Sequence, residues 1–256
     1  TEISISSTLG EAILKKQEFS YGMTEEMNRL RTSILFAGID VKVILITSAV
    51  SAEGKTTVCF NVANSLMELG KRILYLDNDL RKTATLKSVS MPPDWHGVTH
   101  YLSVHCELSD AIYNLEGTNL DICLSGPIPP SSTKLLSGER YRNMFKMLRN
   151  AYDYIIVDTP PIGMVVDAEI IAKECDASIL LIESAKLHAA NARVLKEKLV
   201  STGCPFLGVI LNKVEYSKSG YYGYGKYGKY GHYGYGKYGK YGYGKYGYGK
   251  YENSDK

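Results

Sequence analysis

Short apolar runs alternate with longer amphipathic stretches through most of this chain. The apolar runs are bounded by turn residues and predict strands at 42–47, 73–77, 121–124, 154–158, 178–182 and 207–211. Between them, apolar residues recur at helical spacing, which predicts a helix beginning at Thr24 and helices over 56–69, 137–150, 167–175 and 188–202. Strands that alternate with helices in this way form crossover units and a parallel sheet.

Four of the predicted strands, those starting at Val43, Ile155, Ile179 and Val209, are nearly continuous runs of Val, Ile and Leu. Such runs are typical of strands buried on both faces of a parallel sheet. We therefore expect an α/β fold with a doubly wound, mostly parallel sheet. The segment 91–105, which contains two adjacent prolines, is expected to be an irregular insertion.

The composition changes abruptly after the last predicted strand. Thirteen tyrosines fall within residues 221–251, almost all next to glycine, together with six lysines and no acidic residue. Glycine raises the entropy cost of ordering, and this segment has no aliphatic side chain whose burial could offset that cost. We expect an N-terminal arm (1–22), one α/β domain (23–213), and a linker with a disordered Tyr/Gly-rich tail (214–256).

The charge balance also separates the tail from the rest of the chain. The formal net charge is +3, and residues 220–256 contribute +5 from seven lysines and two acidic residues, so the remainder carries about −2. A domain with this balance has no basic surplus with which to bind nucleic acid, and none is expected as a partner. Five scattered cysteines fit reduced thiols in the cytoplasm. No apolar run approaches the ~20 residues that span a bilayer.

The strongest motif is AVSAEGKT at residues 49–56, between the first predicted strand and a predicted helix. It matches the P-loop pattern, with Ala49 in place of the first glycine. In such a loop, backbone N–H groups and a helix N-terminus face the phosphates of a nucleotide. The lysine, here Lys55, bridges the β- and γ-phosphates, and the hydroxyl, here Thr56, binds Mg²⁺. The expected nucleotide-binding residues of this segment are Ser51, Ala52, Glu53, Gly54, Lys55, Thr56 and Thr57.

Three aspartates follow two other predicted strands. Asp77 and Asp79 are two residues apart at the end of an extended segment, so both carboxylates can face one site. Asp158 ends a run of four apolar residues and precedes two prolines. Because the carboxyl ends of parallel strands share one sheet edge, we expect all three near the phosphates. Together with Thr56 they are candidate Mg²⁺ ligands, and one of them could accept a proton from an incoming hydroxyl.

Asn212 follows the last predicted strand and begins the sequence Asn212-Lys213-Val214-Glu215. This sequence is close to the NKxD pattern with which GTPases recognise guanine, so Asn212 is a further candidate for nucleotide binding. A plain strand exit is the alternative reading, and the pattern leaves both open.

Together, these motifs resemble the bacterial tyrosine kinases of capsule and exopolysaccharide synthesis, in their cytoplasmic Gram-positive form (the CpsD and CapB type). The resemblance covers residues 24–216 and the tail. It rests on the sequences EGKTT, LYLDNDLRK, YIIVDTPP followed by VVDA, and SGPIPPSSTKLL, and on the C-terminal tyrosine cluster.

The resemblance implies that the α/β domain is a kinase domain with ATP and Mg²⁺ as cofactors. It implies catalytic roles for Lys55, Asp77 and Asp79, with Asp77 as the base that activates a tyrosine hydroxyl, and a metal site of Thr56, Asp77, Asp79 and Asp158. It implies autophosphorylation of the tail, whose candidate acceptors are Tyr221, Tyr222, Tyr224, Tyr227, Tyr230, Tyr233, Tyr235, Tyr238, Tyr241, Tyr243, Tyr246, Tyr248 and Tyr251.

The resemblance also implies partners and a location. The partners are an integral-membrane activator that modulates polysaccharide chain length, further copies of the chain, and a cognate phosphotyrosine phosphatase. The enzyme is expected in the cytoplasm, recruited to the inner face of the plasma membrane. Members of the family form rings through a Glu-x-x-Arg-x-x-Arg helix, which this chain matches at Glu25 and Arg31 but not at Asn28. The charges of this helix can equally be a solvated face.

A second hypothesis is a nucleotide switch of MinD/ParA-like architecture without kinase activity, in which the Tyr/Gly-rich tail is an adhesive module. Those ATPases carry a signature lysine five residues before the P-loop lysine. The corresponding residue here is Val50, so a dimer-activated ATPase of that type fits poorly and would not by itself explain the tail.

Overall fold

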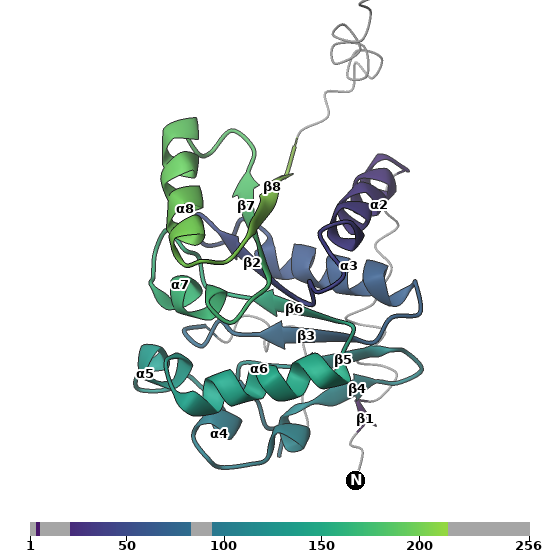
Figure 1. Cartoon of the computed structure of the whole chain (residues 1–256), viewed down its shortest axis with the longest axis vertical. Coiled ribbons are helices and arrows are strands. Elements are labelled where there is room, and N and C mark those ends of the chain that lie inside the picture. The colour runs from purple at the N-terminus through teal and green to yellow at the C-terminus, as the bar shows by residue number, and fades with distance from the viewer. Residues whose placement is uncertain (1–3, 6–20, 83–93, 215–256) are drawn as a thin grey trace, which may run out of the picture. The chain divides into compact units, whose positions relative to one another are not determined.

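The computed structural model describes residues 4–5, 21–82 and 94–214. Eight strands of these residues form one sheet (Figure 1). In their order across the sheet, they are β1 (Ser4–Ile5), β4 (Tyr113–Leu115), β5 (Leu120–Cys123), β3 (Ile73–Asp77), β6 (Tyr154–Asp158), β2 (Val43–Ser48), β7 (Ala177–Glu183) and β8 (Phe206–Asn212). Neighbouring strands are parallel except for β4 and β5, which are antiparallel. The predicted α/β class and mostly parallel sheet are confirmed.

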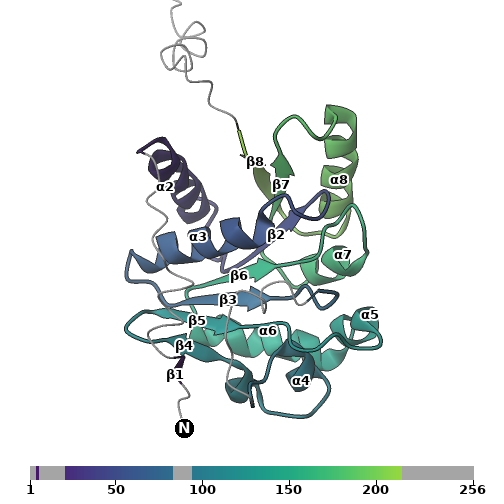
Figure 2. The ribbon, with the colours of Figure 1, turned by 180° about the vertical axis from the view of Figure 1, so that it is seen from behind.

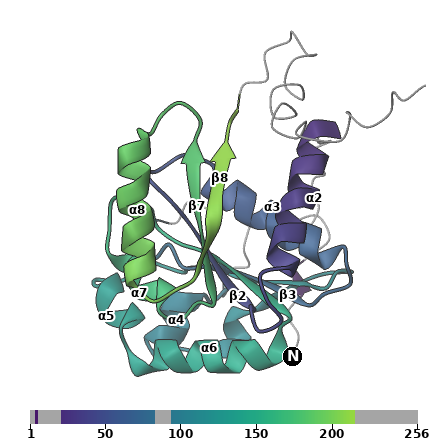
Figure 3. The same cartoon turned by 45° about the horizontal axis from the view of Figure 1, so that its top comes forward.

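Helices cover both faces of this sheet (Figures 2 and 3). One face carries α2 (Tyr21–Leu35) and α3 (Lys55–Met67). The other face carries α4 (Val98–Leu102), α6 (Glu139–Ala151), α7 (Asp167–Ala172) and α8 (Ala189–Ser201). Two short helical segments, η2 (Leu108–Ala111) and α5 (Ser132–Leu136), lie in the connections. Each helix that follows a strand of the parallel region returns the chain to the opposite edge of the sheet.

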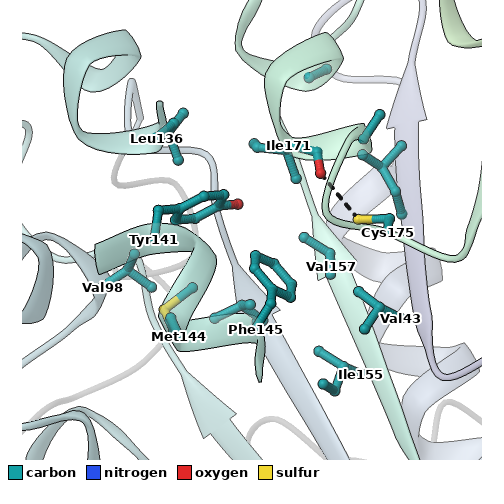
Figure 4. Close-up of a cluster of buried hydrophobic side chains, with 14 of the residues drawn as sticks. Val43, Val98, Leu136, Tyr141, Met144, Phe145, Ile155, Val157, Ile171 and Cys175 are labelled. Atoms are coloured by element: carbon teal, nitrogen blue, oxygen red, sulfur yellow. Dashed lines mark hydrogen bonds between the residues drawn. The ribbon is translucent and has the colours of Figure 1, made fainter. Parts of the chain in front are cut away.

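The alternation of side chains along the central strands divides the core into two layers. In β2, Val43 and Leu45 belong to the layer under α6, α7 and α8, whereas Ile44 and Ile46 belong to the layer under α2 and α3. Figure 4 shows the first layer, where Phe145 of α6 faces strand β6. Because both faces of these strands are covered, their apolar runs are continuous. The strands that carry the P-loop and Asp158 are therefore held rigidly from both sides.

The prediction that the last strand is buried on both faces is wrong. Strand β8 lies at the edge of the sheet, and Leu207, Val209 and Leu211 are 39%, 52% and 56% exposed. Its apolar run matches that of the central strands in composition. Its place in the sheet depends on which strand it pairs with, and the run itself does not encode that choice.

The helix expected over 137–150 is confirmed as α6, and the short helix α5, which ends before Ser137 and Gly138, was not predicted. One further expectation about local structure needs correction. The segment 91–105, expected to be irregular, contains helix α4, whose first N–H donates to Leu124 O (2.8 Å). This backbone contact comes from a distant strand end, which a local pattern does not reveal.

The described elements belong to one compact unit, Thr1–Val214. Residues 4–5 of the expected N-terminal arm pair in parallel with β4. The rest of the arm up to residue 20, and the expected tail with its thirteen tyrosines, lie outside the described residues. Within the described part of the chain, no helix combines the length and apolar character needed to cross a membrane.

Candidate active site

Three loops meet at the carboxyl edge of the central strands. The P-loop follows β2, residues 78–82 follow β3, and residues 159–163 follow β6. These three strands are neighbours in the sheet, and Asp77 is paired in register with Asp158. The sheet therefore brings together the three segments that the sequence singled out, at the edge where parallel α/β sheets bind their ligands.

The backbone of the P-loop has positive φ values at two positions, and only one of them is a glycine. Ala52 and Gly54 both have positive φ values, 66° and 92°. The φ of Gly54 lies in the region that favours glycine, and a Cβ atom there would also displace the Asn212 side chain, whose Nδ2 would be 2.4 Å away. Ala49, which replaces the first glycine of the pattern, is outside the left-handed region. An alanine is thus accommodated at that position without strain.

Asp158 is the centre of a buried polar cluster. Its Oδ1 pairs with Lys55 Nζ, and its Oδ2 accepts a hydrogen bond from Thr56 Oγ1 (2.6 Å). Lys55 and Asp158 are 8% and 1% exposed. Burial is the largest single influence and lowers the pKa of Lys55, but the charge and hydrogen bond of Asp158, together with the nearby Cys59 and Asp79, outweigh it, so the pKa lies above its ordinary value. The ammonium group therefore stays charged in a nearly dry site, where charge acts most strongly.

Tyr75 is a member of this cluster that the sequence analysis missed. Its hydroxyl donates to Asp158 Oδ2 (3.0 Å), and its ring stacks on Phe60 with centroids 3.8 Å apart. Burial and the nearby charges of Asp158 and Asp77 raise its pKa well above the ordinary value, so the hydroxyl keeps its proton. A signal was present: Tyr75 lies two residues before Asp77, on the same side of β3.

The two aspartates after β3 lie in different surroundings. Asp77 is 1% exposed, and its Oδ1 accepts the N–H of Asp79 (3.0 Å). Asp79 is partly exposed, and its Oδ1 accepts the N–H of Arg81 (3.3 Å). Burial raises the pKa of Asp79, partly offset by the charge of Lys55. The spacing suggested that both carboxylates can face one site, and the structure buries Asp77 at the sheet edge while Asp79 stays partly exposed.

The end of β8 supports the P-loop from another direction. Asn212 Nδ2 donates to Glu53 O (2.8 Å), and Lys213 Nζ donates to Ala52 O (2.8 Å). Glu53, expected to bind nucleotide, is 2% exposed, and its carboxylate accepts the N–H groups of Val50 (2.9 Å) and Glu183 (3.1 Å). The buried side chain of Glu53 therefore stabilises the conformation of the P-loop.

The remaining P-loop residues lie at its surface. Ser51 Oγ accepts a hydrogen bond from Lys82 Nζ (2.8 Å), which connects the loop to the segment after β3. Ala52 and Thr57 are exposed. The backbone of the loop and the start of α3 are thus the groups available to a phosphate chain.

A second charged network was not predicted from the sequence. Asp167 is fully buried and accepts hydrogen bonds from Arg81 Nε (2.7 Å) and Nη2 (2.9 Å). It also accepts hydrogen bonds from Ser132 Oγ (2.7 Å) and Thr133 Oγ1 (3.0 Å). Burial alone would raise the pKa of Asp167, but these hydrogen bonds lower it below its ordinary value. The network joins three segments, LRK, SST and VVDA, that lie far apart in the chain.

Helix α2 carries the residues considered for ring formation. Arg31 donates to Asn28 Oδ1 (2.9 Å) and to Ser65 O in α3 (3.1 Å), and it approaches Glu68 (3.7 Å). Arg29 pairs with the exposed Glu26. Arg31 therefore contacts α3 of its own domain, and ring formation stays a prediction.

Among the described residues, no three His, Cys, Asp or Glu side chains form a group that could hold a metal ion by themselves. The Asp158 cluster nevertheless offers hard oxygen donors, with Thr56 Oγ1 and Asp158 Oδ2 in direct contact and Asp77 in register beside them. Mg²⁺ binds few protein oxygens and completes its shell with water and substrate phosphates. The site fits such an ion, bound together with a nucleotide.

The fold and the site define a P-loop nucleotide-binding protein. A family model described as an AAA domain matches residues 41–192. The chain is similar to tyrosine-protein kinase CpsD of Streptococcus pneumoniae serotype 4 (strain ATCC BAA-334 / TIGR4), with 39% identity over 82% of this chain and 93% of that protein. It is similar to tyrosine-protein kinase YwqD of Bacillus subtilis (strain 168), with 36% identity over 78% of this chain and 85% of that protein.

A solved kinase domain has a similar fold. The kinase domain of the Escherichia coli tyrosine kinase ETK matches with a TM-score of 0.73 and 29% identity, over 88% of this chain and 86% of that chain. The chain belongs to the family of bacterial protein-tyrosine kinases, as its motifs suggested, and is an enzyme of that kind.

Proposed function

We propose that this enzyme is an ATP-dependent autokinase that transfers the γ-phosphoryl group to the tyrosines of its own C-terminal cluster, and that it thereby regulates capsular or exopolysaccharide synthesis. The observation that carries the proposal is the convergence of Lys55, Thr56 and Asp158 in one buried cluster beside the P-loop. The chain also carries thirteen tyrosines in residues 221–251. A phosphoryl-transfer site and a set of acceptor tyrosines in one chain fit a self-modifying enzyme.

Lys55 has the main electrostatic role in the proposed reaction. In the structure its ammonium group pairs with Asp158. The phosphates of ATP would compete with this carboxylate, and the lysine would then offset the charge that develops on the transferred group. Backbone N–H groups of the P-loop would orient the phosphate chain, so positioning and charge neutralisation supply most of the catalysis.

Thr56, Asp77, Asp79 and Asp158 are the residues that would hold Mg²⁺, which supplies further charge neutralisation on the phosphates when bound. Asp77 is the proposed acceptor of the tyrosine proton, with Asp79 beside it. The proposal is supported by the position of Asp77, which is paired in register with Asp158 at the carboxyl ends of neighbouring strands. Asn212, whose side chain contacts the P-loop backbone, is proposed to lie near the base of ATP.

Several partners belong to this proposal through the family. An integral-membrane protein would activate the enzyme and bring it to the inner face of the plasma membrane. Copies of the chain would assemble with one another, and a phosphotyrosine phosphatase would reverse the modification. Each added phosphate carries about −1.5 to −2 charges at pH 7. Four would therefore outweigh the +5 of residues 220–256, and the reversed charge would loosen assemblies of tails.

A mixing experiment tests the proposal directly. A Lys55→Met chain serves as the acceptor, and an active chain whose tail tyrosines are all changed to Phe serves as the enzyme. After incubation with ATP and Mg²⁺, mass spectrometry locates phosphotyrosine on each chain. We expect it on the tail of the Lys55→Met chain, at several sites. ATP turnover without any phosphotyrosine would favour a nucleotide switch with an adhesive tail.

A further inference from the structure

A groove lies beside the Asp158 cluster, at the same edge of the sheet. Its volume is about 340 Å³, and it is lined by Leu80, Arg81 and residues 128–133. The first two follow β3, and the others follow β5, which is the neighbour of β3 on the side away from β6. None of the roles assigned to the site so far uses this groove.

The groove combines an apolar wall, a polar wall and one fixed planar cation. Ile128, which is 59% exposed, forms the apolar wall with Pro129 and Pro130, and residues 131–133 form the polar wall beside Arg81. Arg81 is held by Asp167 through two hydrogen bonds of 2.7 and 2.9 Å. This bidentate contact fixes the plane of the guanidinium group and offsets its charge. The wall is thus suited to the flat face of an aromatic ring.

The groove is adjacent to the place where phosphoryl transfer would occur. Leu80 immediately follows Asp79, whose carboxylate accepts the N–H of Arg81 (3.3 Å). Lys82, the next residue, reaches Ser51 of the P-loop (2.8 Å). Arg81 of the groove is thus flanked in the chain by a segment that leads to Asp79 on one side and, through Lys82, to the phosphate loop on the other.

We infer that this groove is the acceptor subsite, which receives the phenol ring of a tyrosine from residues 221–251. The inference rests on the proposed function and names the surface that selects its substrate. Forty-two residues follow the described structure, and fourteen of them are tyrosines, thirteen within residues 221–251. Most are flanked by glycine, which lets the peptide backbone approach a surface closely. Because Asp167 offsets the charge of Arg81, the groove does not repel this basic segment.

Steady-state kinetics with a separate acceptor tests this assignment. The full-length chain phosphorylates a biotinylated peptide of residues 221–251, and the peptide product is counted apart from the chain. Ile128→Asn removes an exposed apolar wall without changing the charge, which matters because the peptide is basic. Ile39→Asn is the matched control, since Ile39 is 96% exposed and lies before β2, at the opposite edge of the sheet.

We expect Ile128→Asn to raise the KM for the peptide about fivefold, the scale of one lost apolar contact. The KM for ATP and the kcat at saturating peptide should not change, because the contact serves ground state and transition state alike. Ile39→Asn should behave like the unaltered chain. A peptide with every Tyr replaced by Phe should inhibit competitively and lose potency by the same factor against Ile128→Asn.

The possible outcomes distinguish a failure of the proposed function from a failure of the groove assignment. If the unaltered chain does not phosphorylate the peptide, the proposed function fails, and the groove has no substrate to select. If it does, but Ile128→Asn has an unchanged KM for the peptide, the groove is not the acceptor subsite although the function stands. An equal rise in both KM values, or a loss of kcat alone, would also overturn the assignment, because it would indicate a distortion of the whole site.

Discussion

Lys55 and Asp158 meet at the carboxyl ends of the central strands, whereas Asn212 and Lys213 lie at the end of the edge strand. We define the phosphate side as Lys55, Asp158, Thr56 and Tyr75. Both partners of its Lys55–Asp158 ion pair are almost fully buried. The β8 side consists of Glu183, Asn212 and Lys213, and the side chain of Lys213 is 47% exposed. Both sides contact the P-loop, but the phosphate side is buried away from water and the β8 side is exposed to it.

This difference predicts that the two sides affect different kinetic constants of the reaction. Charges in a dry, preorganised site act strongly on a developing transition state. Contacts at an exposed edge are weakened by water and suit recognition of a ligand that must also leave. We therefore expect changes on the phosphate side to reduce kcat, and changes on the β8 side to affect affinity.

The largest effect should come from Lys55→Met. The change removes the cation that offsets phosphoryl charge and leaves the buried carboxylate of Asp158 without its ion-pair partner. We expect kcat for tail phosphorylation to fall by at least about 100-fold. The measurement is phosphotyrosine yield against time at saturating ATP, with circular dichroism as the control for folding. A yield equal to that of the unaltered chain would refute the assignment of this loop.

Asp77→Asn should also act mainly on kcat. An amide cannot take the phenolic proton, and it serves a metal ion less well than a carboxylate. We expect kcat to fall by about 10- to 100-fold, while the affinity for ATP changes much less. Isothermal titration with ATP, beside the turnover assay, separates the two quantities. A collapse in ATP affinity with normal turnover of the bound ATP would make Asp77 a metal ligand only.

The Arg81–Asp167 and Lys213–Glu183 ion pairs should contribute differently to the free energy of unfolding. Asp167 is buried and its pKa is lowered by Arg81, Ser132 and Thr133, so Asp167→Asn should cost about 2 kcal/mol of unfolding free energy at pH 7. Glu183→Gln, at the β8 side, should cost less.

The pH dependence of this stability follows from the sign of the shift. A lowered pKa means that Asp167 stabilises the fold above the unfolded-state pKa of about 4, and that this contribution is lost as the pH falls through the folded-state value. The difference between the unaltered chain and Asp167→Asn should therefore shrink below about pH 4. Denaturant unfolding at several pH values measures it. A difference that is constant across that range would contradict the ionised state of Asp167.

Tyr75→Phe should have a moderate effect, through Asp158. The variant keeps the ring stacked on Phe60 but removes the hydrogen bond to Asp158 Oδ2. We expect the Mg²⁺ concentration for half-maximal activity to rise about threefold and the unfolding free energy to fall by about 1 kcal/mol. Titration of activity with Mg²⁺ is the measurement. A loss of stability with an unchanged Mg²⁺ requirement would show that Tyr75 only supports the core.

The smallest effect should come from Asn212→Ala, on the β8 side. Loss of its contact with Glu53 O should raise the KM for ATP about two- to threefold with little change in kcat. We also expect the unaltered chain to prefer ATP to GTP, because Glu215 is longer than the aspartate of the GTPase pattern. Competition titrations with both nucleotides test this. Displacement of ATP by an equal or lower concentration of GTP would show that guanine is the base recognised.

Much of this architecture is present in the local sequence. The P-loop, the aspartates after β3 and β6, and the alternation of strands and helices each depend on neighbouring residues, and the sheet type follows from that alternation. These patterns are informative because backbone geometry acts over a few residues. They were enough to predict that Lys55, Asp77 and Asp158 share one sheet edge.

Other features depended on contacts between distant segments. Val209 belongs to a run as apolar as that of β2, yet its strand became an edge because it pairs with β7 alone among the described strands. Tyr75, Arg81 and Asp167 acquired their partners across 83 to 86 residues of chain. Hydrogen bonds of this kind require a particular strand order, which no short segment specifies. The sequence by itself determined which chemical groups are present and which ends of strands carry them, and the tertiary structure decided which of those groups meet.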